Sequence, residues 1–379
     1  MVYRLDINNN KDISDIPLSG NPQISYFTKV FRKHTDFRIS TYIQKCSETH
    51  LNKLNHMGDL VKSISLEYGI NTPTIESNIG TSMIDYISLY ASDNEIERLS
   101  GSYIENYMQL KNARSFNASM NSNNECLDGT MEQILSLSGG VFHTDYASIL
   151  NISIPIPFSF SSEEGSSIPI FLFHKEKPLQ IKFSINEIAG NNPTNFQFRI
   201  DYIILTEDEK LRFMNFNNEY LYETIKEQKI EIKNILSETV INNTYGNIKS
   251  IMWNNPINSD NDCEYNISVN NYKLFNYNKS YHYFTRHTIF KSGFDGGGTD
   301  ISANNIIHDD SIAYYSFALI DNDKESPMAP TGSISCNKNK ISFISKNNGS
   351  NNNIEVILYV KSYNIININN DKLTIKYAH

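Results

Sequence analysis

The chain lacks the features that mark membrane-spanning, secreted and metal-binding proteins. No run approaches the ~18 consecutive apolar residues that a membrane-spanning helix needs. The first residues, MVYRLDINNNKD, hold no apolar signal core, so we expect no export by that route. The 379 residues include only four cysteines, too far apart for metal-ligand spacing: Cys46, Cys126, Cys263 and Cys336. We therefore expect reduced thiols, as in a cytosolic protein, and no bound metal.

Motifs for catalysis and nucleotide binding are also missing. There is no Gly-x-Ser-x-Gly elbow and no P-loop. The loop Asp295–Thr299 is similar to the phosphate-binding turn of actin-like ATPases but is one residue short before its glycines, so we interpret it as a surface loop. His282 and His287 lack further ligands at fixed spacing, and the pairs Glu163–Glu164 and Asp309–Asp310 lie in polar surroundings. The sequence thus predicts no enzyme, no catalytic residue and no cofactor.

Acidic residues outnumber basic residues in this chain. With 33 Lys and Arg against 42 Asp and Glu, the formal charge is −9. A nucleic-acid-binding protein usually carries a basic face. We therefore expect no direct nucleic-acid binding.

The strongest pattern that is present is an alternation of apolar and polar residues. A period of two is typical of half-buried strands, and many short strands separated by Asn, Gly, Ser and Pro turns favour β-sandwiches. Two alternating prolines, Pro155 and Pro157, predict that their strand lies at a sheet edge, since proline cannot donate to a central ladder. The alternating runs are Leu150–Phe160, Leu179–Ile185, Phe196–Ile204, Ile354–Val360 and Leu373–Tyr377.

Helical patterns are scarce. The best spans Glu207–Lys229, with acidic residues in its first turn and apolar residues at helical spacing. A second helix could lie within Ile96–Leu110. Because the first of these lies near mid-chain, we expect it to join two sandwiches, one over residues 21–205 and one over 206–379, after an N-terminal arm of residues 1–20. No sequence repeat relates the two halves, although each has room for the eight strands of a jelly roll.

Five short motifs follow one another in an order typical of a known family. The first, Gly20–Phe37, combines a Gly-Asn-Pro-Gln-Ile turn, an aromatic run and a basic Arg-Lys-His-Thr segment. The others are Gly58–Val61, Ile154–Phe158, Asp201–Leu205 with the acidic residues after it, and Tyr315–Leu319. Together they make the chain resemble the double jelly-roll major capsid proteins of nucleocytoplasmic large DNA viruses.

This resemblance implies an all-β fold of two consecutive jelly-roll sandwiches and a structural role. Three copies would form a pseudo-hexagonal capsomer, and capsomers would tile an icosahedral shell assembled in the host cytoplasm. The expected partners are further copies of the chain and minor capsid or inner-membrane proteins. The first motif supplies candidate assembly residues: Asn21, Pro22, Gln23, Arg32, Lys33 and His34.

Alternatives remain open at the level of sequence. Arg32, Lys33 and His34 also fit a solvated basic turn. The chain is short for the family, and a scaffold protein of the poxvirus type shares the fold. A β-sandwich module that binds glycans is a further possibility, because 23 tyrosines and abundant asparagine suit sugar stacking and hydrogen bonding.

Overall fold

The computed structural model describes most strands of the chain and part of its loops. Contacts divide the chain into two units, Met1–Asp36 and Phe37–His379, and all the sheets lie in the second. The described residues are 27, 34–70, 79–91, 94–111, 117–118, 127–128, 135–138, 151–162, 164–173, 178–187, 193–215, 218–232, 236–241, 246–254, 263–274, 277–278, 300–301, 306–307, 312–319, 330–347, 354–369 and 372–375.

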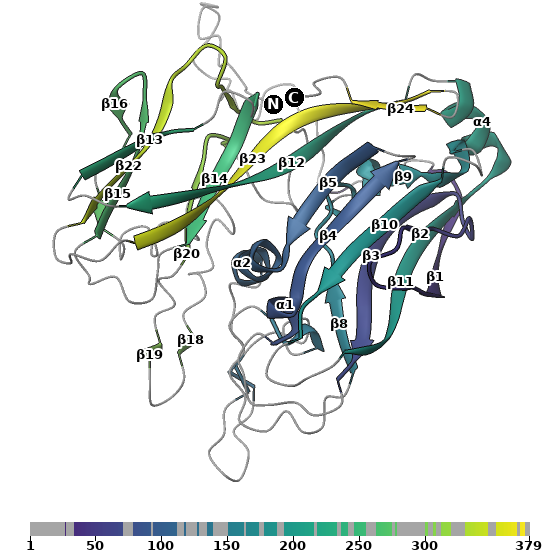
Figure 1. The fold of residues 1–379 in the computed structure, drawn as a ribbon. Coiled ribbons are helices and arrows are strands. Elements are labelled where there is room, and N and C mark those ends of the chain that lie inside the picture. The colour runs from purple at the N-terminus through teal and green to yellow at the C-terminus, as the bar shows by residue number, and fades with distance from the viewer. Residues whose placement is uncertain are drawn as a thin grey trace, which may run out of the picture. The chain divides into compact units, whose positions relative to one another are not determined.

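Two antiparallel sheets form a first sandwich from the N-terminal half (Figure 1). One has the order β1 (Phe37–Lys45), β11 (Thr194–Leu205), β3 (Leu60–Gly69) and β8 (Asn151–Pro155), with β9 (Ile168–Pro169) also on β3. The other has the order β2 (Asn52–Lys53), β10 (Leu179–Ile185), β4 (Ile84–Ala91) and β5 (Asn94–Ser100).

The C-terminal half forms a second sandwich in the same way. One sheet has the order β12 (Asn218–Ile232), β23 (Ile354–Asn369), β14 (Asn247–Asn254) and β20 (Ile312–Ser316), with β21 (Ile334–Ser335) on β14 and β24 (Lys372–Ile375) on β23. The other has the order β13 (Leu236–Val240), β22 (Ile341–Asn347), β15 (Cys263–Val269) and β16 (Tyr272–Lys273), with β17 (Tyr277–Asn278) on β15.

The strand order is the same in both sandwiches. The strands named first in the four sheet orders above are counted here along the chain, separately for each sandwich. In each sandwich the first strand pairs with the last, the last with the third, and the third with the sixth. The second sheet joins the second, seventh, fourth and fifth strands. This is the jelly-roll arrangement, so the fold is the expected double jelly roll. The two halves repeat in topology although no repeat is visible in their sequences.

Helices and small ribbons connect these strands. These helices include α1 (Ile79–Ser82), α2 (Gly101–Lys111), α4 (Glu207–Asn215) and the 3-10 turns η2 (Ser159–Ser161), η3 (Glu164–Ser166) and η4 (Ile170–Leu172). The ribbons pair β6 (Asn117–Ala118) with β7 (Leu127–Asp128), and β18 (Asp300–Ile301) with β19 (Ile306–Ile307).

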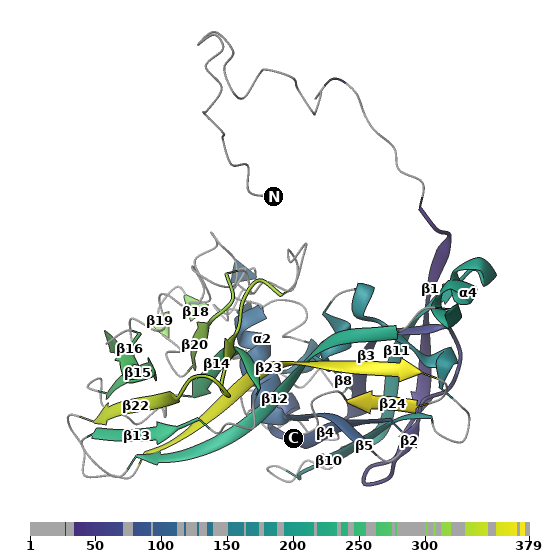
Figure 2. The same ribbon diagram turned by 90° about the horizontal axis from the view of Figure 1, so that it is seen from above.

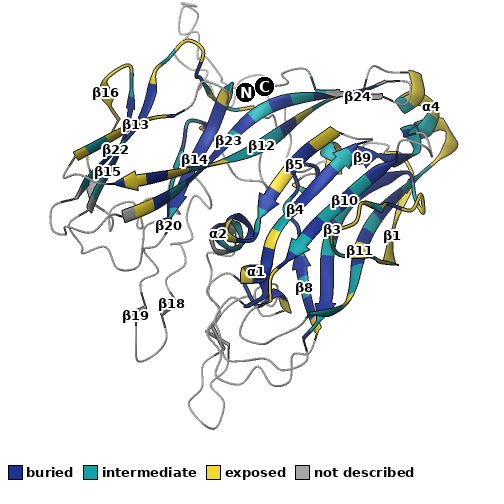
Figure 3. Cartoon of the chain, in the orientation of Figure 1, coloured by how far each residue is buried: buried dark blue, intermediate teal, exposed yellow. Residues whose placement is uncertain are grey.

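The alternating runs form strands with one face in the core. Along β10, Leu179, Ile181 and Phe183 are buried while the residues between them are half-buried (Figure 3). The proline-containing strand β8 pairs with β3 alone among the described strands, so the prediction of an edge strand is confirmed. Phe183 and Phe198, from opposite sheets, meet edge to face at 5.6 Å between ring centroids. Burial of such alternating apolar faces is what holds the sheets together.

The predicted helix over Glu207–Lys229 is wrong in its second part. Helix α4 ends at Asn215, and the following residues form β12, which pairs with β23 along its whole length. The reason is that Tyr222, Ile230 and Ile232 lie at even spacing and are buried. A continuous ladder with buried side chains outweighs local helical propensity. The second helical region is partly as predicted, since α2 follows directly after β5.

Candidate functional site at the junction of the two sandwiches

Two sequence motifs meet where the first sandwich ends. A Cβ at Gly58 would lie 2.4 Å from the Cβ of Tyr202, so only glycine fits there. The next residue, Asp59, accepts the N–H of Leu205 at 2.8 Å and pairs with Lys210 of α4 at 3.2 Å. These contacts fasten the last strand of the first sandwich at the point where the chain turns into α4. The motifs Gly58–Val61 and Asp201–Leu205 therefore act together in the structure.

The apolar core of the first sandwich continues into the second half. Buried residues of β12, β14, β20 and β23 belong to the same cluster as the first sandwich's core, whereas a separate cluster fills the interior of the second sandwich. A pocket at the junction is lined mainly by apolar residues of β4, β5, η2, β12 and β23, together with Glu97 and Ser159. The shared residues are Tyr222, Met252, Ile312, Tyr359, Ile366 and Ile368.

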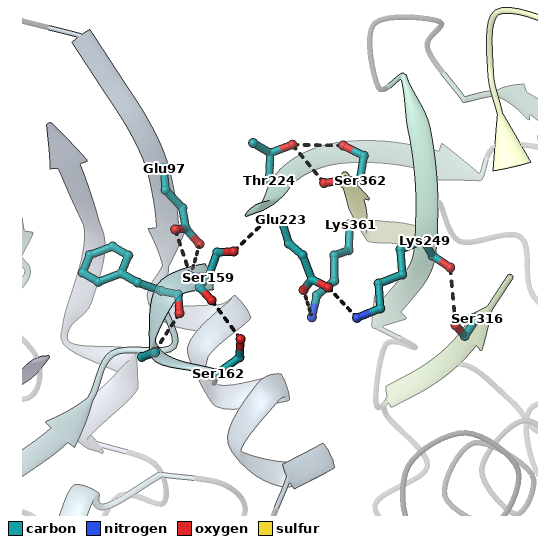
Figure 4. A network of polar contacts seen from close by, with 11 residues as sticks. Glu97, Ser159, Ser162, Glu223, Thr224, Lys249, Ser316, Lys361 and Ser362 are labelled. Atoms are coloured by element: carbon teal, nitrogen blue, oxygen red, sulfur yellow. Dashed lines mark hydrogen bonds and ion pairs between the residues drawn. The ribbon is translucent and has the colours of Figure 1, made fainter. Parts of the chain in front are cut away.

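A buried acidic side chain lies on the first-sandwich side of this junction (Figure 4). Glu97 of β5 is only 4% exposed, and the backbone N–H of Ser159 donates to its carboxyl group, with its nitrogen 3.1 and 3.2 Å from the two oxygens. The Oγ of Ser159 in turn accepts the backbone N–H of Glu223 of β12 at 2.7 Å. The turn η2 thus connects a strand of the first sandwich to a strand of the second.

Glu223 extends the network into the second sandwich. Its carboxylate binds the buried ammonium of Lys249 on β14 and, at 3.0 Å, that of Lys361 on β23. Neighbouring contacts join the same strands, since Thr224 Oγ1 lies 3.0 Å from Ser362 Oγ. Two cations therefore face one carboxylate on the second sandwich, and Glu97 lies across η2 from them (Figure 4).

Burial is the largest influence on the protonation of Glu97. Burial raises the pKa of the Glu97 carboxyl to about 8, the Ser159 N–H and Lys361 lower it, and the Glu223 carboxylate raises it. A carboxyl with this pKa is largely protonated at neutral pH. The arrangement connects backbone segments of the two sandwiches, which is a structural task.

Helix α2 supplies further contacts across the junction. Tyr359 of β23 donates its hydroxyl to Ser102 Oγ at 2.8 Å, and its ring lies 5.6 Å from that of Tyr103. Asn106 donates to the side-chain oxygen of Asn254 on β14 at 2.5 Å. The first sandwich therefore contacts the second through β5, α2 and η2.

Most of the residues that the sequence singled out lie outside the described part of the chain. This holds for Asn21, Pro22, Gln23, Arg32 and Lys33, and for the loop Asp295–Thr299, His282, His287, Glu163 and Asp309–Asp310. Of the candidate assembly residues only His34 is described; it is exposed, and its Nδ1 lies 3.1 Å from the Thr35 carbonyl oxygen.

Other expectations can be compared directly with the structure. Glu164 pairs with Lys62 at 3.0 Å, and Cys46 and Cys336 are free thiols whose pKa burial raises, to about 12 and about 11. Within the described residues, no three His, Cys, Asp or Glu side chains are grouped so as to hold a metal ion. No helix in this part of the chain is both long and apolar enough to cross a membrane.

Sequence reasoning missed the junction itself. Two motifs lead into it: Ile154–Phe158 is followed directly by Ser159, and Tyr315–Leu319 contains Ser316, whose Oγ donates to the Lys249 carbonyl at 3.4 Å. The signal available in the sequence was these two motifs themselves, because one directly precedes Ser159 and the other contains Ser316. The partners Glu97, Glu223 and Lys361 carry no local pattern that separates them from surface charges.

Comparisons with known proteins agree on one kind of relative. A family model described as the N-terminus of major capsid proteins matches residues 25–193. The major capsid protein of Pyramimonas orientalis virus is 23% identical over 275 residues, which cover 69% of this chain and 67% of that protein. Capsid protein 1 of Acanthamoeba polyphaga mimivirus is 20% identical over 249 residues, or 56% of this chain and 41% of the relative.

Solved structures extend the likeness to almost the whole chain. A quasi-atomic model of the PBCV-1 virus capsid superposes with a TM-score of 0.68 and 16% identity, covering 94% of this chain and 100% of that one. At this identity the superposition shows a common fold. Both sandwiches, including the half that the family model does not match, therefore share the architecture of that chain.

Proposed function

We propose that this chain is a structural subunit of a viral capsid, because it is similar to the double jelly-roll major capsid proteins of nucleocytoplasmic large DNA viruses. The observation that carries the proposal is the repeated strand order of its two sandwiches. Three copies of such a chain present six similar sandwiches around one axis, which gives a pseudo-hexagonal outline. A cyclic trimer gives every copy the same contacts.

The finer parts of the proposal concern assembly. We propose that trimers are the capsomers, that they tile an icosahedral shell, and that they assemble in the host cytoplasm with minor capsid or inner-membrane proteins. Residues Asn21, Pro22, Gln23, Arg32, Lys33 and His34 remain the candidate contacts with neighbouring subunits. The division at residues 20 and 205 remains a proposal for the domains. This role uses surfaces and requires no catalysis or cofactor.

Light scattering after size exclusion tests the trimer. We expect three times the chain mass of 43.4 kDa at micromolar concentration, and hexagonal particles in negative-stain electron microscopy. A clean monomer that binds sugars on a glycan array would contradict the proposal and favour a glycan-binding module. Mass spectrometry of purified virions separates capsid subunit from scaffold, since a scaffold of the poxvirus type leaves the mature particle.

A further inference from the structure

The first strand of the first sandwich exposes a row of large apolar side chains. β1 is paired along its length with β11, and the described residues contain no strand on its other edge. Phe37, Ile39 and Ile43 share one face of β1 and are 59%, 50% and 52% exposed. An exposed apolar edge strand is a template for pairing with another chain, and proteins normally protect such edges.

The equivalent strand of the second sandwich exposes one large apolar side chain, Leu221, and its other exposed residues in the described part are charged. β12 has the same place in its sheet as β1, at the edge and next to the last strand (Figure 2). Its exposed residues toward the C-terminal end are Glu227, Lys229 and Glu231, and Lys229 is paired with Glu355 at 3.6 Å. Charged side chains of this kind oppose edge-to-edge association. The apolar row on β1 is therefore a property of this sequence and is not imposed by the topology.

The second sandwich exposes its apolar residues on a different edge. β13 pairs with β22 alone among the described strands, and its Leu236 and Val240 are 61% and 46% exposed. Between them lies Glu238, also exposed. The equivalent strand of the first sandwich, β2, has only two residues. Each sandwich thus has one long edge with exposed apolar residues, and the two edges differ in topological position.

We propose that β1 of one copy packs against β13 of a second copy, so that each exposed edge covers the other. This inference rests on the proposed function and names the surfaces that would join the subunits. The patterns match, because Ile39-Thr41-Ile43 and Leu236-Glu238-Val240 are both apolar, polar, apolar at alternate positions of a strand.

Charge favours one register of this pairing, in which Lys45 lies opposite Glu238 and Ile43 lies opposite Val240 or Leu236. Lys45 ends the apolar row of β1 and has no ion-pair partner among the described residues. Glu238 gives β13 the opposite sign at the centre of its row. Its own partner is Lys340, at 3.3 Å with both side chains about half exposed, which leaves the carboxylate open to a second cation. Two copies of β1 would instead bring like charges together.

The location of the two edges determines the kind of assembly. Because they lie on different sandwiches, each copy offers one edge to the copy before it and one to the copy after it. A contact between two different surfaces is heterologous, and it forms a closed ring when the rotation from each copy to the next adds up to a full turn. Three copies then satisfy every β1 and every β13. A trimer with three identical contacts leaves neither apolar edge in water.

Charge substitutions on the two edges test the pairing. The double variant Ile39→Lys/Ile43→Lys and the double variant Leu236→Lys/Val240→Lys should both shift the light-scattering mass from three chains to one. The matched control is Leu211→Lys/Met214→Lys on α4, where the side chains are 55% and 58% exposed. It makes the same chemical change at the same exposure and should remain trimeric.

Disulfide trapping keeps the proposal testable if a charged variant fails to fold. Two chains are compared, one with Ile43→Cys and Val240→Cys and one with Ile43→Cys and Leu236→Cys. The first should give covalent dimers and trimers on a non-reducing gel after mild oxidation if the strands run antiparallel, and the second if they run parallel. Ile43→Cys alone should give no more cross-link than the unmodified chain. Dimers from the single variant would show pairing of β1 with itself and overturn the proposal.

The outcomes separate this inference from the proposed function. If the unmodified chain is trimeric, but both edge variants stay trimeric and no paired cross-link forms, the subunits join elsewhere and only the β1–β13 contact is wrong. If the unmodified chain is a monomer, the trimer itself fails and the contact fails with it.

Discussion

At the scale of single residues, Glu97 has the most unusual surroundings of the described acids. Its carboxyl binds a proton more tightly in the folded protein, where the pKa is about 8, than in the unfolded chain, where it is 4.5. Between these values the folded state holds a proton that the unfolded state has lost. Folding stability therefore falls as pH rises through this window, by at most about 1.4 kcal/mol for each pH unit.

We expect Glu97→Gln to flatten this pH dependence. The glutamine keeps an acceptor for the Ser159 N–H and cannot ionise, so the stability lost between pH 5 and pH 8 in the unmodified protein should be largely retained in the variant. Urea unfolding midpoints at each pH measure the effect. The matched control is Glu95→Gln on the same strand, where the residue is exposed. An equal slope for Glu97→Gln and the unmodified chain would contradict the assigned protonation.

Sequence alone could not have located this residue. Glu97 lies 62 positions from Ser159 and is one of several acids in a mixed segment. The surroundings of Glu97 are formed by η2 and β12, which come close to it only after both sandwiches have folded. By contrast, Gly58 could be singled out by its motif, although the side chain that excludes any larger residue there, Tyr202, becomes visible only in the structure.

At the scale of elements, the start of α2 depends on close backbone contact. A Cβ at Gly101 would lie 2.2 Å from the carbonyl oxygens of both Ile84 and Thr81. We expect Gly101→Ala to move α2 away from β4 and to lower stability by roughly 1–3 kcal/mol, the usual cost of overpacking. Urea unfolding measures this loss.

Gly165 provides the matched control. No atom lies within 4 Å of a Cβ placed there. Gly165→Ala should therefore leave the unfolding midpoint nearly unchanged, and a loss equal to that of Gly101→Ala would mean that the close contact at α2 is not the cause.

Strands were predictable from the sequence where a segment followed a single period of apolar residues. Runs such as Leu179–Ile185 and Phe196–Ile204 follow a period of two and became β10 and β11. Asn218–Ile232 carries both periods, because Leu221 and Ile225 fit a helix whereas Tyr222, Ile230 and Ile232 fit a strand. Only pairing with β23, more than a hundred residues later, decides between them. Such long-range contacts are not visible in a local window.

At the scale of the whole molecule, the shared apolar core couples the two sandwiches. Tyr222, Tyr359 and Ile366 come from the second half but pack with the core of the first. Neither half can bury its junction face alone. We expect a single calorimetric transition with equal calorimetric and van't Hoff enthalpies for the dissociated chain. Two separate peaks would mean that the sandwiches unfold independently.

The connection between the halves contributes little to this coupling. Helix α4 has no buried residue, and its side-chain contacts with the first sandwich include the Lys210–Asp59 pair and the edge-to-face contact of Phe213 with Phe171. The peptide link therefore acts mainly by keeping each half at a high effective concentration near the other. Two polypeptides produced together in one cell, the first ending at Asn215, should then reassemble. Co-purification through a tag on one fragment measures this, and recovery of the tagged fragment alone would show that covalent continuity is required.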